Sequence, residues 1–354
     1  MTPATEPETL SPMAESMASP PPQMVLMQMI TGYWVSQSIF AAAKLGLADH
    51  LSTGEKNCAE LATATGSHEP SLYRLLRALA SVGIFAETKP STFAITPLAT
   101  FLRSDVPGSV RDASIMMGDQ EHYGSWGNIL HAIKTGDSSF QDRFGMNIFD
   151  YYGQNPEAAN IFDRAMTSFS SPEIAGVISD YDFSGIKSLV DVAGGQGSLL
   201  TAILQANPTM TGTLFDMPDV IERAKSHIAD SPVSERCQLV SGSFFESVPA
   251  GADAYILKHI IHDWDDQRAI AILKQCHQAM AANGKVLVVE QVIPPGNDPF
   301  IGKFLDVNML VMCPGGKERT AAEFQALFAQ AGFKLTRIVP THGIVSVIEG
   351  MRLS

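Results

Sequence analysis

The histidine at position 262 has the type and the place in the sequence expected of a general base. It lies near the end of residues 253–264, which begin as an apolar run and end in polar residues. Open α/β sheets bind ligands at the carboxyl ends of parallel strands, so a strand here would bring His262 to a cleft. A single histidine is more often structural, but Asp263, Glu290 and Glu318 could orient this one if the fold brings them together.

The chemistry expected of this histidine is removal of a proton from a hydroxyl. A phenol has a pKa near ~10 and an imidazole near ~6.5, so transfer is uphill but becomes feasible as the oxygen attacks an electrophile. Such a step needs no metal ion. The cysteines form no C-x-x-C pair, so we predict neither a zinc site nor disulfides, and we expect reduced thiols in the cytoplasm. They are Cys58, Cys237, Cys276 and Cys313.

Three glycines follow an apolar run in the second half of the chain and precede an apolar helix start. Gly194, Gly195 and Gly197 would let a ligand approach the backbone closely at a strand-to-helix turn. Leu200 stands where the dinucleotide motif G-x-G-x-x-G has its third glycine, which disfavours hydride transfer. Asp216 ends the next predicted strand, where an acidic side chain can bind both ribose hydroxyls of a cofactor. A plain strand end with a turn is the alternative.

These residues must be positioned by a region in which apolar runs alternate with helical segments. Such alternation predicts a mostly parallel, doubly wound α/β sheet. The last two runs follow a helix and lie close together, so we expect them to pair antiparallel at the sheet edge. The turn after the third strand contains Phe244, which could cover an adenine face. The predicted strands are residues 186–193, 211–216, 237–241, 253–257, 285–293, 333–340 and 343–350.

Ahead of the sheet, residues 24–110 predict a smaller helical domain with a winged-helix layout. One long amphipathic helix or two shorter ones cover 24–51, and helices over 58–66 and 67–85 precede a hairpin over 87–102.

A winged helix can bind DNA, here through Arg74 and Arg77 on its second helix. Residues 39–103 hold six basic and five acidic side chains, a net charge of +1 that offers little attraction for DNA. We therefore expect a dimerisation scaffold, with DNA binding as the alternative.

The segment between the two domains is helical in character and rich in large apolar side chains. Adaptable methionine and aromatic side chains commonly hold flat aromatic ligands, so part of this segment could line a pocket, and plain core packing is the alternative. The residues are Met116, Met117, Trp126, Phe140, Phe144, Met146, Phe149, Phe162, Met166 and Phe169.

The overall composition fits an acidic enzyme rather than a nucleic-acid-binding protein. The net charge of -13 and the pI near 5.1 oppose binding to a phosphate backbone. No run of 18 apolar residues predicts a transmembrane segment, and no basic start before an apolar run predicts a secretory signal. Six prolines among the first 22 residues favour a disordered tail over 1–23.

Taken together, the motifs strongly resemble those of S-adenosylmethionine-dependent O-methyltransferases of the caffeate, hydroxyindole and bacterial polyketide or carotenoid type. The likeness runs from about residue 24 to the C-terminus. It rests on LVDVAGGQG, FDMPDV, GSFF, DAYILKHIIHDWDD, GKVLVVEQVIP and DVNMLVMCPGGKERTAAEF, which are specific only in combination. It implies a Rossmann-like sheet, S-adenosylmethionine as cofactor with S-adenosylhomocysteine as product, and an N-terminal domain that forms a homodimer and helps complete the partner's substrate site.

The resemblance also implies a role for each matched residue. His262 matches the general base, Glu290 and Glu318 match the acids that orient it, and Asp263 adjoins it. Met166 and Met309 match the methionines that clamp the acceptor ring. The cofactor-binding residues would be Gly194, Gly195, Gly197, Asp216, Met217, Ser243, Phe244, Phe245 and Lys258. The acceptor-binding residues would be Trp126, Phe162, Met166, Met309, Met312 and Cys313.

Two positions depart from the family's pattern. Ser243 stands where the family usually has an aspartate beside the adenine, so that hydrogen bond is weaker or passes through water. Ala193 replaces the first glycine of the usual V-G-G-G. Both changes are small, and they bear on the adenine contacts more than on the reaction.

The sequence thus predicts methyl transfer from S-adenosylmethionine to a hydroxyl of a small aromatic (phenolic, quinol, polyketide or indole) or polyene metabolite, with His262 as base and no metal. The alternatives are a winged-helix regulator, and an enzyme that uses the same cofactor without methyl transfer. The predicted domains are a disordered tail (1–23), a dimerisation domain (24–110), a helical linker with the acceptor pocket (111–180) and a catalytic domain (181–354).

Overall fold

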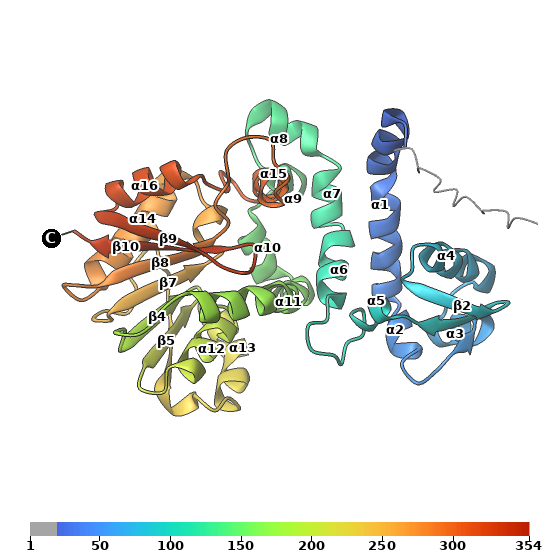
Figure 1. The fold of residues 1–354 in the computed structure, drawn as a ribbon, viewed down its shortest axis with the longest axis horizontal. Helices are drawn as coiled ribbons and strands as arrows, with labels where there is room; N and C mark the ends of the chain where they lie inside the picture. Colours follow the sequence, from blue (N-terminus) through green and yellow to red (C-terminus); the bar gives the residue numbers. More distant parts are fainter. Residues whose placement is uncertain (1–19, 354) are drawn as a thin grey trace, which may run out of the picture.

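The computed structural model describes residues 20–353, which form an N-terminal helical part and a C-terminal α/β part (Figure 1). A seven-stranded sheet lies at the centre of the α/β part, with the order β6-β5-β4-β7-β8-β10-β9. This is the doubly wound sheet that the alternating pattern predicts. Its strands are β4 (Ser188–Val192), β5 (Thr211–Asp216), β6 (Cys237–Ser241), β7 (Ala254–Lys258), β8 (Lys285–Glu290), β9 (Phe333–Pro340) and β10 (Ser346–Arg352).

Helices cover both faces of the sheet, as is expected when parallel strands are connected by crossover helices. One face packs against α12 (Ser198–Ala206), α13 (Pro218–Ala229) and the end of α11 (Pro156–Asp180). The other face packs against α14 (Asp266–Ala279) and α16 (Ala321–Gln330). Strands β4, β7 and β8 are buried on both faces, which explains their nearly continuous apolar sequences.

The last two strands pair antiparallel, as predicted, and β10 also pairs antiparallel with β8. The antiparallel strand therefore lies one place inside the edge, between β8 and β9. A buried carboxylate on β10 fixes this arrangement: Glu349, only 5% exposed, accepts hydrogen bonds from Tyr181, Thr336 and Arg337 and forms an ion pair with Lys285.

The N-terminal part has the predicted winged-helix layout. Its elements are α1 (Pro22–Lys44), α2 (Leu47–His50), β1 (Lys56–Asn57), α3 (Cys58–Thr65), α4 (Glu69–Ser81), β2 (Phe85–Lys89), β3 (Thr92–Ile95) and α5 (Pro97–Thr100). Its core combines apolar side chains from its helices and from β2 and β3, among them Leu47, Leu61, Leu76 and Phe93.

Helix α1 begins at Pro22, two residues inside the segment predicted to be a disordered tail. Proline is well tolerated in the first turn of a helix because its missing N–H would have no partner there. The prediction for residues 1–19 lies outside the described residues.

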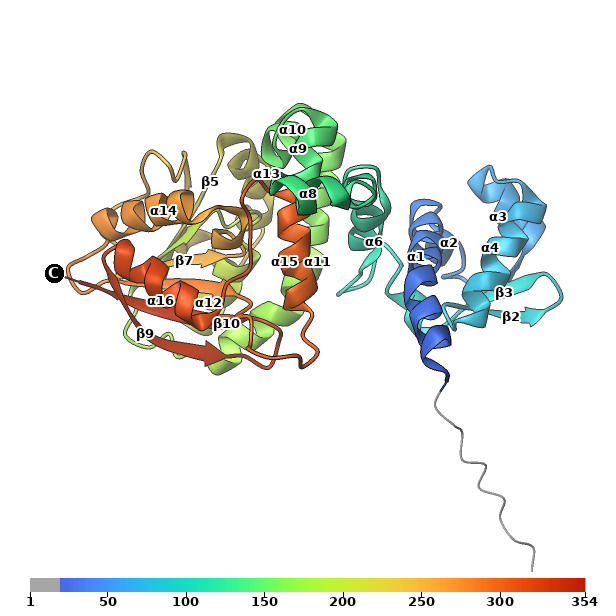
Figure 2. The ribbon, with the colours of Figure 1, turned by 90° about the horizontal axis from the view of Figure 1, so that it is seen from above.

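Short helices between the two parts connect α1 to the C-terminal α/β part. Figure 2 shows α6 (Arg111–Gly118) between α1 and α11, and it packs against both. The others are α7 (His122–Trp126), α8 (Ile129–Thr135), α9 (Ser139–Phe144) and α10 (Ile148–Gln154), next to α15 (Gly302–Met312).

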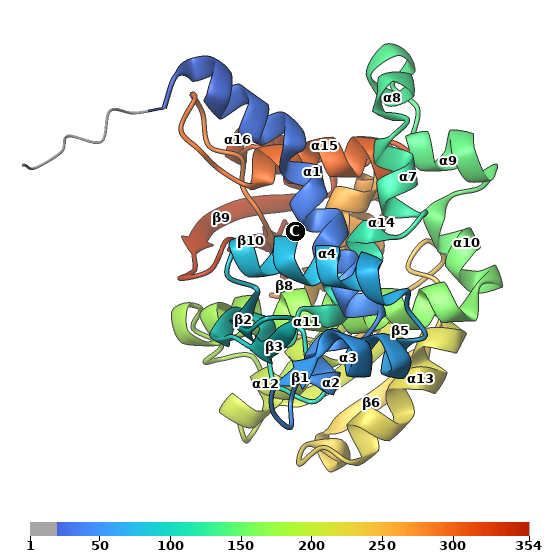
Figure 3. The same cartoon turned by 90° about the vertical axis from the view of Figure 1, so that its right-hand side faces the viewer.

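The start of α1 presents large apolar side chains that no other described residue covers. Figure 3, with the N-terminal part in front, shows this end of α1 extending past α4. Met29 is 72% exposed and Trp34 60%. No helix among the described residues is both long and apolar enough to span a membrane.

The Glu349 cluster predicts an acid-dependent loss of stability. Burial raises the pKa of this carboxyl, but hydrogen bonds from Thr336, Tyr181 and Arg337 outweigh burial and lower it from 4.5 to about 2. A depressed pKa stabilises the fold fully above the unfolded value, and this contribution is lost as the pH falls from about 4.5 towards 2. We expect the Glu349→Gln variant to lose less unfolding free energy than wild type over this range in urea titrations. The exposed Glu246→Gln variant should follow wild type, and a Glu349→Gln curve parallel to wild type would contradict the prediction.

Candidate active site

The predicted site residues gather at one edge of the sheet. Strands β4, β5, β7 and β8 run parallel, so their carboxyl ends face the same side. The glycine turn follows β4, Asp216 ends β5, Lys258 ends β7 and Glu290 ends β8. His262 is the fourth residue after β7 and lies within the 3-10 helix η2 (Ile261–Asp263). This edge is where open α/β sheets bind their ligands.

The His262 imidazole is buried and held by carboxylates from two directions. Its Nδ1 lies 2.6 Å from Glu318 Oε1, and its backbone N–H donates to Glu290 Oε1 at 3.0 Å. Its Nε2 lies 3.6 Å from Asp263 Oδ1. When Nδ1–H donates to Glu318, the lone pair of Nε2 is left to accept a proton.

The carboxylates around His262 make it a stronger base. Burial alone would lower the pKa of His262, but the charges of Asp263, Glu318 and Glu290 outweigh burial and raise it to about 10. A raised pKa makes the imidazole a stronger proton acceptor, so proton transfer from a phenol, whose pKa is near ~10, is less uphill than transfer to a free imidazole. Burial in turn raises the pKa of Glu290 to about 7 and that of Asp263 to about 6.

Arg319, which sequence reasoning missed, holds the loop that carries His262. Its side chain is fully buried and donates to the carbonyl oxygens of Ile261 and Trp264, each at 2.9 Å, and to Asp266. The neighbouring Lys317 N–H donates to the His262 carbonyl at 2.8 Å. The segment containing Glu318 is therefore fastened to both sides of the histidine, which fixes the Glu318 carboxylate against Nδ1. The adjacent Glu318 was the only sequence signal for Arg319.

The glycine turn has the shape needed to receive a ligand. A Cβ on Gly194 would lie 2.5 Å from the carboxyl group of Asp191, so only glycine fits there. Gly195, at φ +59, faces open space, and its N–H donates to Asp216 at 2.9 Å. Ala193 has φ 57, a conformation that costs a non-glycine residue about 1–2 kcal/mol. The turn thus keeps its backbone course without the family's first glycine.

Asp191 is a second residue that sequence reasoning missed. It is 1% exposed, and its Oδ2 is buried with no hydrogen-bond partner among the described residues. Burial raises its pKa to about 7. A buried carboxylate oxygen without a partner suits a ligand that brings a cationic or hydrogen-bonding group, as the amino acid and ribose groups of S-adenosylmethionine would. A charged residue within an otherwise apolar strand was the available signal.

Lys258 lies in a buried ion cluster beneath this turn. Its Nζ donates to Ser170 at 2.7 Å and to Glu173 at 3.3 Å, and His259 Nε2 lies 2.9 Å from Glu173. Burial lowers the pKa of Lys258, and Glu173 opposes this change. Glu173 and Ser170, which the sequence did not indicate, come from α11, so this cluster ties the acceptor-side helix to strand β7.

Aromatic rings form a wall beside the turn after β6. Trp264 packs edge-on against Phe244 and Phe245, with centroid separations of 6.0 and 4.9 Å. Phe245 is 39% exposed and Met217, at the start of α13, is 54% exposed, so both remain accessible. Ser243 uses its hydroxyl to accept the Phe245 N–H and makes no contact that replaces the family's aspartate. The wall therefore offers flat surfaces for an adenine.

All but one of the predicted acceptor residues gather in one apolar cluster beside the histidine loop. The cluster contains Met309, Met312 and Cys313 from α15 and its end, and Trp126 and Phe162 pack against it. Cys313 Sγ lies 3.5 Å from Asp263 Oδ1, which connects the cluster to the catalytic loop. Met166 packs with Phe162 in the adjoining cluster rather than against Met309. Trp126 Nε1 donates to Asn308 at 2.8 Å, a contact that the sequence did not predict.

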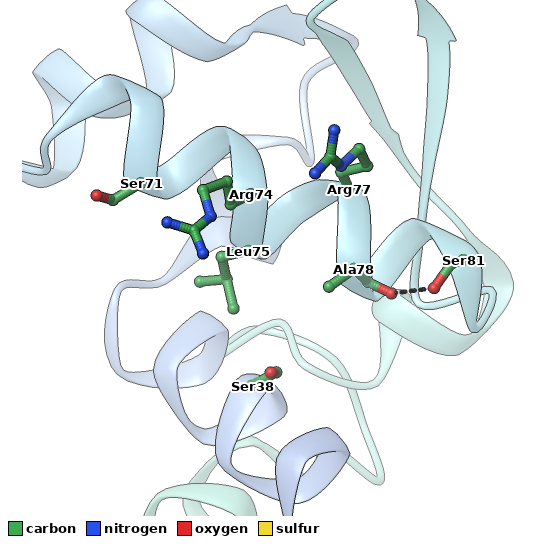
Figure 4. A pocket seen from close by; sticks show the side chains of 7 residues that line it. All are labelled: Ser38, Ser71, Arg74, Leu75, Arg77, Ala78 and Ser81. Atoms are coloured by element: carbon green, nitrogen blue, oxygen red, sulfur yellow. Dashed lines mark hydrogen bonds between the residues drawn. The ribbon is translucent and has the colours of Figure 1, made fainter.

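Arg74 and Arg77 line a separate hollow in the N-terminal part. Figure 4 shows both side chains on α4, with Ser71 and Ser81 on the same helix and Ser38 on α1. The hollow has a volume of about 580 Å³. Arg77 stacks over the ring of Tyr73. This surface shares no residue with the catalytic cluster.

No group of three or more histidine, cysteine, aspartate or glutamate side chains able to hold a metal ion occurs among residues 20–353.

Comparison with protein families identifies the chain. Residues 126–334 match an O-methyltransferase domain, and residues 27–105 match an O-methyltransferase dimerisation domain. The chain belongs to the O-methyltransferase family. The predicted family, the fold and the enzyme class are therefore confirmed.

The relatives act in secondary metabolism. A phenazine O-methyltransferase, PhzM, from Lysobacter antibioticus is 47% identical over 93% of this chain and 96% of its own length. A mitomycin biosynthesis 6-O-methyltransferase from Streptomyces lavendulae is 36% identical over 90% of this chain and 92% of its own.

Solved structures agree with this assignment. The crystal structure of LaPhzM matches with a TM-score of 0.92 at 46% identity, covering 94% of this chain and 100% of that one. A complex of the O-methyltransferase NcsB1 with S-adenosylmethionine and 2-hydroxy-5-methyl naphthoic acid matches with a TM-score of 0.79 at 35% identity, covering 90% and 96%.

The contact between Glu318 and His262 predicts a measurable change in basicity. Replacing Glu318 by glutamine keeps an oxygen that can accept Nδ1–H but removes a negative charge, so the pKa of His262 should fall. Titration of isotope-labelled histidine by NMR measures it directly. The exposed Glu235→Gln variant should leave the His262 pKa unchanged. An unaltered His262 pKa in Glu318→Gln would contradict the electrostatic account.

The Glu173 cluster predicts a large stability effect. Glu173→Ala would leave Lys258 and His259 buried without their carboxylate, and breaking a buried pair on one side costs about 3–5 kcal/mol. Chemical denaturation should show a loss of that order. Glu222→Ala, which removes an exposed partner of Lys225, should cost less than about 1 kcal/mol. Equal effects of the two substitutions would show that the buried cluster does not stabilise the fold.

Proposed function

We propose that this O-methyltransferase transfers a methyl group from S-adenosylmethionine to a hydroxyl of a flat aromatic metabolite, with His262 as general base and without a metal ion. The observation that carries the proposal is the buried His262, whose Nδ1 is held by Glu318 while its Nε2 lies 3.6 Å from Asp263, which accepts from Cys313 of the acceptor cluster. S-adenosylmethionine, the predicted cofactor, is bound in the structure of NcsB1, and its demethylated product, S-adenosylhomocysteine, is bound in that of CalO1.

The donor and the protein divide the chemistry between them. S-adenosylmethionine supplies a methyl carbon that its sulfonium charge already activates. Asp191, Asp216 and the glycine turn are the residues that would hold it, and their open backbone and unpartnered carboxylate oxygen fit that group. The protein therefore has to align the acceptor oxygen, exclude water and take up a proton.

His262 would take that proton on Nε2 as the acceptor oxygen attacks the methyl carbon. The O–H bond breaks, the new O–C bond forms, and the imidazole becomes an imidazolium. Glu318 and Glu290, both fully enclosed in the protein, stabilise this cation. Because the histidine alone can do this, the step needs no metal, and activity should persist after dialysis against EDTA.

The acceptor is proposed to be a hydroxylated fused ring, such as a hydroxyphenazine. The named substrates of the relatives include phenazine, naphthoate and aminohydroxybenzoate compounds, all of which are aromatic. In this chain the acceptor cluster brings together Trp126, Phe162, Met309 and Met312, which suit a flat apolar ring. A screen of hydroxylated phenazines, naphthoates and indoles with labelled donor would identify it.

The active form is proposed to be a homodimer. The dimerisation domain covers residues 27–105, and the exposed apolar side chains at the start of α1 lie in it.

The four cysteines of the chain are free, in keeping with the expected cytoplasmic location. We propose no nucleic-acid partner, because the net charge of -13 opposes one.

Replacing His262 tests the proposed mechanism. His262→Ala should reduce kcat by at least ~100-fold, the usual contribution of a positioned base, while the Kd for S-adenosylmethionine stays within a few-fold of wild type. Steady-state kinetics and calorimetry measure the two quantities. The distant surface variant His227→Ala should match wild type in both. Full turnover in His262→Ala would overturn the histidine mechanism.

A further inference from the structure

His262 must return its proton to solvent after every turnover, yet it is almost enclosed. Its side chain is 8% exposed. Of the carboxylates around it, Glu318 has a fully buried side chain and Glu290 is 0% exposed. Each also has one buried oxygen without a hydrogen-bond partner, so neither continues a hydrogen-bonded path towards the surface among the described residues. A proton passed to either of these groups would remain inside the protein.

Asp263 differs from these two carboxylates in its surroundings. Its Oδ1 lies 3.6 Å from His262 Nε2, the nitrogen left without a hydrogen bond to Glu318, and its side chain is 15% exposed. Asp263 also lines a hollow with a volume of about 320 Å³. It therefore has the reactive nitrogen on one side and an accessible space on the other.

The hollow opens between the α9–α10 connection and the start of α14. Its rim is exposed at Gln141, Asp150 and Arg268. Phe149 and Trp264 stack beside it with ring centroids 5.8 Å apart. Polar groups of Asn147 and Asp150 share it with Asp263, so the space is both large enough and polar enough for water.

We propose that Asp263 and this hollow form the exit route for the reaction's proton. After methyl transfer, the imidazolium N–H bond at Nε2 breaks and the proton bonds to the Asp263 carboxylate, which is an uphill step because the pKa of His262 lies above that of Asp263. The imidazole recovers its lone pair and is again a neutral base. Asp263 then gives the proton to water or a buffer base in the hollow and returns to its charged form. No electrons are exchanged, and the only further reactant is solvent.

The geometry separates this role from simple orientation of the histidine. Orientation comes from Glu318 at Nδ1 and from Glu290 at the backbone N–H, both on the far side of the ring from Nε2. Asp263 makes no hydrogen bond to the ring at 3.6 Å and accepts instead from Cys313. A small shift is enough for it to reach Nε2 once the acceptor has left. The inference rests on the proposed role of His262 as base.

The experiment compares single-turnover and steady-state rates with a monohydroxylated phenazine and S-adenosylmethionine. A single turnover needs no proton release, whereas repeated turnover does. In Asp263→Asn we expect the ratio of the steady-state rate to the single-turnover rate to fall at least ~10-fold. Added imidazole, a small base that can enter the hollow, should restore the ratio in Asp263→Asn and leave wild type unchanged.

Two further variants make the result decisive. Asp263→Glu keeps a carboxylate, so it should need no added imidazole. Glu318→Gln should lower the single-turnover rate itself and gain nothing from imidazole. If Asp263→Asn lowers both rates equally, or if imidazole has no effect on it, the exit route is wrong even when His262→Ala is inactive. If His262→Ala remains active, the proposed function fails instead.

Discussion

The short contact between Glu318 and His262 Nδ1 is the interaction on which the rest of the site depends. A buried imidazole has two nitrogens, and only a fixed partner on one of them leaves the other available as a base. Glu318 supplies that partner at 2.6 Å. The segment that carries this carboxylate is held by other contacts: Glu318 N–H donates to Asp306, Lys317 N–H to the His262 carbonyl, and Arg319 to the carbonyl of Ile261. The segment GGKERT thus holds the histidine loop in place and also supplies the Glu318 carboxylate.

Helix α11 connects the predicted acceptor-binding side of the site to its cofactor-binding side. Its Phe162 and Met166 belong to the acceptor side, while Asp163 accepts from Gln196 in the glycine turn and from Arg223 in α13. Further along, Glu173 accepts from Lys258 at the end of β7. One helix therefore contacts the predicted acceptor residues, the glycine turn and the end of β7, so it helps to set the distance between acceptor and donor, to which methyl transfer is sensitive.

Much of this fold could be predicted because its determinants are local. The five apolar runs that become β4 to β8, the glycine turn after β4 and His262 after β7 are each recognisable within a few residues. The contacts that set the chemistry are not local. Glu173 meets Lys258 across 85 positions, and His262 meets Glu318 across 56. Asp191 and Arg319 escaped prediction because a buried charge is identified by the groups around it, and sequence alone does not show them.

The balance of charge at this edge of the sheet favours a cationic reactant over a neutral product. Asp191, Asp216 and Glu173 on the donor side face two basic side chains, Lys258 and Arg223, and a histidine whose pKa burial lowers. A site with excess negative charge binds a cationic sulfonium more tightly than a neutral thioether, because the attraction acts in a water-poor environment. In the proposed mechanism, methyl transfer removes that positive charge from the donor and creates one on His262, next to Glu290 and Glu318. In that mechanism, the carboxylates that favour binding of the cationic reactant therefore bind the neutral product less tightly. The positive charge at the site is then the imidazolium of His262, which must next lose its proton.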